Sequence, residues 1–110
     1  MYATRSRESW GIGDLADLAR LGRFARGLGA GVVMINPLTA PTPVPPIEPS
    51  PYYPSSRRFS NPLYLRVEEV PGWQELDAGF RERVGQAGRA LNGSRRIERD
   101  AIFELKMEAL

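Results

Sequence analysis

Two tyrosines that stand between prolines are the residues of this sequence whose types and spacing best suit contact with a ligand. They lie in the segment Ser50-Pro51-Tyr52-Tyr53-Pro54. An aromatic ring packs on an apolar face of a ligand and a phenol exchanges hydrogen bonds with its polar groups, and Tyr52 offers both a ring and a phenol. The flanking prolines reduce the conformational entropy that is lost when the pair is fixed.

The residue types that are missing exclude several kinds of catalytic site. The chain has 110 residues, 42% of them hydrophobic, and it contains no cysteine and no histidine. Disulfides and thiolate metal sites are therefore excluded, and the commonest general base is absent. Any acid–base chemistry would have to come from Asp, Glu, Lys or Tyr. No glycine-rich nucleotide motif, zinc motif or nucleophile elbow is present.

The charge of the chain is nearly balanced, with 15 basic and 13 acidic side chains and a formal net charge of +2. Arg20, Arg23 and Arg26 alternate with apolar positions, which favours a solvated helix face over a phosphate-binding stripe. We therefore expect no nucleic-acid partner. The first ten residues have no apolar core of a signal peptide, and no stretch approaches the ~20 apolar residues of a membrane span. We expect a soluble, cytoplasmic chain with no membrane partner.

The elements that must position the tyrosines begin with a helix over about residues 14–28, capped by Asp14 and ended by Gly29. The β-branched run 32–35, Val-Val-Met-Ile, then predicts a strand buried on both faces, as in a parallel sheet covered by helices. Only residues 1–4 could supply the end of a strand before the helix. Helix followed by buried strand is half of a βαβ unit, so the chain is expected to start inside a fold.

A long proline-rich loop follows the predicted strand. Residues 37–62 hold nine of the ten prolines, so this segment cannot be a helix or a central strand. Loops of this length in compact domains are usually functional or disordered. Beyond it, the pattern predicts a short strand over 63–67, a helix over about 73–91 and a last helix capped by Ser94 that runs to residue 110.

Three segments resemble the amylomaltase family, also called 4-alpha-glucanotransferase or disproportionating enzyme. The first is Ser9-Trp10-Gly11-Ile12-Gly13-Asp14, and the second is Asn36-Pro37-Leu38. The third and most specific is residues 50–64, SPYYPSSRRFSNPLY. Their order and spacing also match the family, and the resemblance covers most of residues 5–110.

The resemblance implies an α/β fold, an incomplete (β/α)₈ TIM barrel whose first strands and helices make a partial catalytic barrel over residues 1–110. Residues 1–36 would form the end of the first strand, the helix and the second strand, 37–62 the active-site loop, and 63–110 a short strand and two helices. Loops after the strands carry the active site of such barrels. The partners implied are maltooligosaccharides or other α-1,4-glucans and, if the rest of the barrel is encoded separately, that polypeptide. No metal or organic cofactor is implied.

The resemblance also implies the site residues. Tyr52 matches the family tyrosine beside the sugar next to the scissile bond, and Ser50 and Pro51 belong to the same motif. Asn61 opens Asn-Pro-Leu-Tyr, and we expect it mainly to hold the loop. The predicted substrate-binding residues are therefore Ser50, Pro51, Tyr52 and Asn61.

No catalytic residue is predicted in this chain. Retaining transfer between sugars needs a nucleophilic carboxylate and an acid/base carboxylate roughly 5–5.5 Å apart. In the family these lie on the fourth and fifth strands, and their motifs do not occur here. A complete barrel needs ~250 residues, so we expect the chain alone to be an inactive fragment of a 4-alpha-glucanotransferase that carries part of its sugar site. The alternative is a non-catalytic module that binds glucan, or a partner protein, through the proline-rich loop, in which Pro46-Ile47-Glu48-Pro49 matches a bare PxxP pattern.

Overall fold

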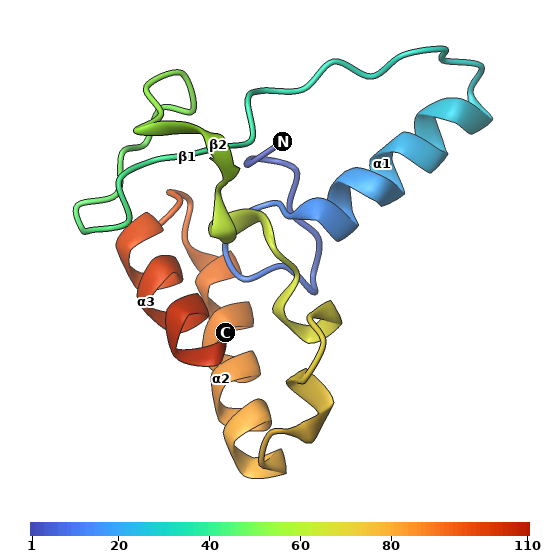
Figure 1. Cartoon of the computed structure of the whole chain (residues 1–110). Coiled ribbons are helices and arrows are strands. Elements are labelled where there is room, and N and C mark those ends of the chain that lie inside the picture. Colours follow the sequence, from blue (N-terminus) through green and yellow to red (C-terminus); the bar gives the residue numbers. More distant parts are fainter.

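The computed structural model describes all residues 1–110 and consists of three helices, a two-stranded sheet and several 3₁₀ turns (Figure 1). The elements are α1 (Leu15–Gly27), β1 (Thr39–Ala40), β2 (Ser56–Ser60), α2 (Ala78–Ala90) and α3 (Arg99–Ala109). Helices α2 and α3 pack side by side, whereas α1 projects from the other side of the molecule (Figure 1). No helix is long and apolar enough to cross a membrane.

Helix α1 begins where the sequence predicts. The Asp14 side chain accepts a hydrogen bond from the Asp17 backbone N–H, and the Asp17 carboxylate accepts one from the Asp14 N–H, which together form a capping box. The helix ends before Gly29, whose φ of 87° is the left-handed conformation that favours glycine. No apolar side chain of α1 is fully buried, since Asp17 is its only buried residue.

The core lies between the N-terminal segment, the turns after the loop and the helix pair α2–α3. Trp10 and Trp73 meet edge to face, with ring centroids 6.2 Å apart. One apolar cluster surrounds them and a second lies nearer the loop. The first contains Trp10, Val67, Trp73, Val84 and Ala109, and the second Ile12, Ile47, Leu63, Tyr64 and Ile102.

The glycine-rich N-terminal segment is fastened to the helix pair by polar contacts that the sequence pattern does not reveal. The Asn92 amide donates to the Ser9 carbonyl at 2.6 Å and accepts from the Gly11 N–H at 3.1 Å. Arg5 donates to the carbonyl of Ser94 at 3.1 Å. Ser94 itself does not cap α3 as predicted: Glu98 stands at the N-cap without a side-chain cap bond, and the Ser94 hydroxyl donates to the Glu98 carboxylate instead.

The predicted strands are absent, and the sheet that does form is antiparallel. Residues 32–35 are extended but unpaired, with Val32 86% and Met34 94% exposed, because no other segment of this chain lies beside them. Residues 1–4 contain a turn, and residues 63–67 form no strand: they run from the 3₁₀ turn Pro62–Tyr64 through a two-residue link into the 3₁₀ turn Val67–Glu69. The short sheet pairs Thr39 with Ser60 and Ala40 with Ser56. The chain thus contains both helix and strand, and its one sheet is an antiparallel pair inside the segment 37–62 that was predicted to be a loop.

Gly88 of α2 leaves the space that the Trp10 ring fills, because a Cβ at this position would overlap the indole. We expect Gly88→Ala to lower the free energy of unfolding by about 1–3 kcal/mol through overpacking. Urea unfolding followed by tryptophan fluorescence measures this change. Gly22→Ala in α1 is the matched control, since nothing lies within 4 Å of its added methyl group, and it should be neutral or stabilising by up to ~1 kcal/mol. Equal effects of the two substitutions would contradict the packing assignment.

Candidate functional site

The proline-rich loop over residues 41–55 is tied at its base to the short sheet. The Ser55 N–H donates to the Ala40 carbonyl at 3.1 Å, and the Asn61 N–H donates to the Leu38 carbonyl at 2.8 Å. Inside the loop, the Ser50 hydroxyl accepts from the Tyr52 N–H at 3.3 Å. The Glu48 carboxylate accepts from the Ser50 N–H at 2.8 Å. Ser50 therefore builds the turn that presents Tyr52.

Tyr52 combines a free ring with a fixed phenol. Its side chain is 64% exposed, and its phenol oxygen accepts a hydrogen bond from the Asn36 amide at 2.9 Å. Asn36 directly follows the extended run 32–35 and opens the second motif. Its bond to Tyr52 therefore brings the second and third motifs into contact. The exposed ring surface is the part of the predicted site that could pack on a ligand.

Asn61 has a structural task in this geometry. Its side-chain oxygen accepts from the Leu63 N–H at 3.0 Å and caps the 3₁₀ turn Pro62–Tyr64. The cavity that it lines with Ser50 and Pro51 has a volume of about 10 Å³, which is room for about one water molecule and too small for a sugar ring. The Thr39 hydroxyl, which lines the same cavity, has no partner in the chain, so a water fits there.

The PxxP segment does not present a free peptide ligand. Ile47 is buried in the second apolar cluster, and its N–H donates to the Asp100 carboxylate of α3 at 2.7 Å. A polyproline ligand must lie extended on the partner's groove with its side chains accessible. The packing of Ile47 therefore disfavours the alternative that this motif recruits a peptide-binding domain.

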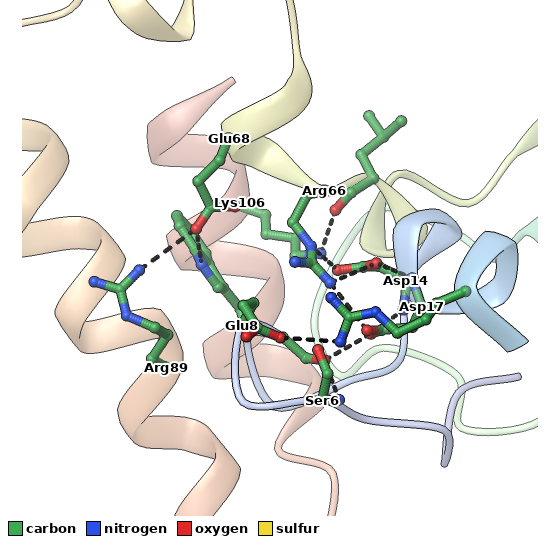
Figure 2. Close-up of polar contacts among 12 residues, drawn as sticks. Ser6, Glu8, Asp14, Asp17, Arg66, Glu68, Arg89 and Lys106 are labelled. Atoms are coloured by element: carbon green, nitrogen blue, oxygen red, sulfur yellow. Dashed lines mark hydrogen bonds and ion pairs between the residues drawn. The ribbon is translucent and has the colours of Figure 1, made fainter.

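A buried ionic cluster lies between the start of α1 and the turns after the loop (Figure 2). Arg66 donates from Nε and Nη2 to the two oxygens of Asp14, and Nη2 also donates to Asp17 at 3.0 Å. The Ser9 hydroxyl donates to Asp17 at 2.6 Å. Sequence reasoning identified Asp14 as a cap but missed Arg66, because nothing in a local pattern links residues 52 positions apart.

Lys106 of α3 completes the cluster. Its ammonium group donates to the carbonyls of Leu63 and Leu65 at 2.7 and 2.6 Å, and the residue is 1% exposed. Burial lowers the pKa of Lys106 to about 8, although the nearby Asp14 and Glu68 carboxylates oppose that shift. The lysine therefore holds the segment that leaves the loop.

The two carboxylates beside Arg66 cannot be the pair that a retaining glycosidase uses. Burial on its own raises the pKa of Asp17, but hydrogen bonds from Ser6 and Ser9 and the charge of Arg66 outweigh it, so this pKa lies below its usual range. A carboxylate held ionised is a poor general acid, and Asp14 and Asp17 are both buried. No group of three or more acidic side chains lies close enough together to hold a metal ion.

Comparison with known proteins identifies the family. The glycoside hydrolase 77 family model, described as 4-alpha-glucanotransferase, matches residues 1–110, so the chain belongs to this family. A 4-alpha-glucanotransferase of Mycobacterium tuberculosis is 48% identical over an alignment 122 positions long, gaps included, and one of Haemophilus influenzae is 40% identical over 114 positions. Each alignment covers 100% of this chain and 16% of the relative. The resemblance drawn from the three motifs is confirmed.

A solved structure shares the arrangement of the chain. The crystal structure of amylomaltase from Corynebacterium glutamicum matches 97% of this chain with a TM-score of 0.91 and 38% sequence identity. The match covers 16% of that protein's chain. The chain thus spans only a small part of the length of the relatives it matches.

Removing one charge from the buried cluster tests its contribution to stability. Asp14→Asn keeps an oxygen for the helix cap but leaves Arg66 with a single charged partner. We expect a loss of about 2–3 kcal/mol in the free energy of unfolding, measured by urea titration. The exposed pair Arg83–Glu108 is the control, and Glu108→Gln should cost less than ~1 kcal/mol. A smaller loss for Asp14→Asn than for the control would show that the cluster is not stabilising.

The depressed pKa of Lys106 predicts that stability rises with pH. Between pH 8 and 10 the unfolded chain keeps this proton while the folded chain releases it, so raising the pH favours the folded state. We expect a gain of about 2 kcal/mol over this window from urea titrations at successive pH values. Lys106→Met should lose this pH dependence whatever its own stability. The same slope in both proteins would show that another group titrates.

Proposed function

We propose that this chain is a piece of a 4-alpha-glucanotransferase that carries part of its sugar-binding site. The complete enzyme would transfer α-1,4-glucan segments between maltooligosaccharides by a retaining mechanism. The observation that carries the proposal is the exposed Tyr52 ring, held by Asn36 in a proline-rich loop, in a chain whose every residue falls within the family model.

In this proposal residues 1–110 are a partial catalytic barrel, with 37–62 as a loop on its active-site face. The exposed apolar run 32–35 becomes a barrel strand when neighbouring strands from the rest of the enzyme lie beside it. The run directly precedes the loop, and ligands of such barrels bind on the loops at the carboxyl ends of the strands. The unpaired backbone and high exposure of this run support the assignment.

The chemistry is divided between this chain and the rest of the enzyme. Tyr52 supplies a ring for the C–H face of a glucose unit and a phenol for one of its hydroxyls. In this proposal the nucleophile and the acid/base carboxylate come from the rest of the enzyme, and the buried pair Asp14 and Asp17 of this chain is held by Arg66. Ser50 and Pro51 set the turn, and Asn61 holds its base.

The proposal predicts glucan binding without turnover. Titration of the chain with maltotriose, followed by NMR, should shift the Tyr52 ring signals, and Tyr52→Ala should weaken binding at least about fivefold through loss of the aromatic platform. Chromatography of maltotriose incubated with the chain should show neither glucose nor longer glucans.

Tyr53→Ala is the matched control for this titration. Tyr53 is adjacent and 75% exposed, yet it does not line the groove beside Tyr52. Its loss should leave binding within about twofold, since no packing contact with the sugar is removed. Transfer products from the pure chain, or equal weakening by both alanine variants, would contradict the proposal.

A further inference from the structure

A groove runs beside Tyr52 on the exposed side of the loop. Three of its lining residues are prolines, one is the tyrosine, and two are polar; they are Pro37, Thr39, Pro51, Tyr52, Pro54 and Arg57. The proline rings and the aromatic ring make most of the wall apolar. Arg57 is the one charged group among them, so it decides which polar ligand the groove can hold.

The guanidinium of Arg57 is available for a ligand. The five ion pairs of the chain join Arg20, Arg66, Arg83 and Arg89 to carboxylates, and Arg57 takes part in none of them. Arg57 is exposed, and no hydrogen bond to the loop holds it. An arginine that only stabilised the loop would be expected to pair within it.

An irregularity of the sheet presents this side chain. The pairing moves by one residue on β1, from Thr39 to Ala40, but by four on β2, from Ser60 to Ser56. The extra residues of β2, which include Arg57, therefore bulge from the ladder. Bulges are frequent beside binding sites, where they redirect a side chain. Arg58 leaves the same bulge but does not line the groove.

The groove fits a neutral polyhydroxyl ligand better than an anion. A phosphate site gathers several backbone N–H groups or a second cation, whereas proline lacks an N–H and half of the lining residues are prolines. A single guanidinium presents parallel N–H donors at a spacing that suits two oxygens held side by side. Two neighbouring hydroxyls of a glucose unit supply such oxygens.

We propose that Arg57 is a further sugar-binding residue of this groove, which donates hydrogen bonds to a pair of adjacent hydroxyls while the Tyr52 ring packs on the sugar. This inference rests on the proposed function, because it assigns a further residue to the binding of glucan at the same site. It also makes Arg57 a determinant of specificity, since sugars without two adjacent hydroxyls in reach lose one of its bonds.

The experiment compares neighbouring arginines in the 110-residue chain. Binding of maltotriose is measured by NMR titration for the wild type, Arg57→Gln and Arg58→Gln, after thermal unfolding has shown that each variant melts like the wild type. Arg57→Gln should weaken binding about tenfold, because hydrogen bonds from a charged donor are lost. Arg58→Gln should stay within about twofold. Equal weakening by both would mean that general charge is responsible and would overturn the proposal.

Two further outcomes separate this proposal from the function on which it rests. If Tyr52→Ala weakens maltotriose binding and Arg57→Gln does not, the role of Arg57 is wrong and the glucan site stands. If the wild type binds no maltotriose, both are wrong. The last titration uses inorganic phosphate. If phosphate binds more tightly than maltotriose and Arg57→Gln abolishes this binding, the ligand of the groove is an anion and the sugar proposal is overturned.

Discussion

The contact on which the rest of the structure depends is the buried pairing of Arg66 with Asp14 and Asp17. Charges removed from water must be paired, and a planar guanidinium between two carboxylates permits few arrangements. The contact fixes the start of α1 against the turn that follows the loop. The segment between residues 17 and 66 contains α1, the extended run and the proline-rich loop. Because the contact joins the two ends of this segment, the segment starts and ends at the same place in the molecule.

The same point is held from the side of the helices. Lys106 of α3 binds the carbonyls of Leu63 and Leu65, and Glu68 accepts from the Trp10 indole at 2.8 Å and faces Arg89 of α2 at 3.5 Å. Polar contacts thus converge on residues 63–68, among them those of Arg66 and Glu68 (Figure 2), and Val67 of this segment belongs to the apolar cluster of Trp10 and Trp73. A loop with few internal hydrogen bonds can keep a tyrosine exposed because its base is fixed in this way.

The sequence patterns correctly predicted those features of the fold that depend on residues close to one another in the chain. The cap of Asp14, the end of α1 at Gly29 and the lack of an α-helix in the proline-rich segment 37–62 follow from residues close to one another in sequence, whereas the pairing of β1 with β2 inside that segment was not predicted. The prediction of a strand at 32–35 correctly identified an apolar run. A strand also needs a partner strand beside it, and the sequence pattern does not show whether one is present. At 63–67 the Asn61 cap and the lysine bonds to two carbonyls favour 3₁₀ turns over a strand. For the site, the motif indicated Tyr52, whereas the hydrogen bond between Asn36 and the Tyr52 phenol joins two segments and could not be read from either one.

The two sides of the molecule differ in how completely they are packed. The helix pair and the turns bury their apolar residues against one another, whereas Phe24, Leu28 and the run 32–35 stay exposed. Exposed apolar backbone without partners favours strand pairing. Because Asn36 directly follows this run, a strand that pairs with 32–35 also fixes the amide that holds the Tyr52 phenol. In the proposed enzyme, pairing of 32–35 with a further strand and orientation of the Tyr52 phenol would therefore be linked through the Asn36 side chain.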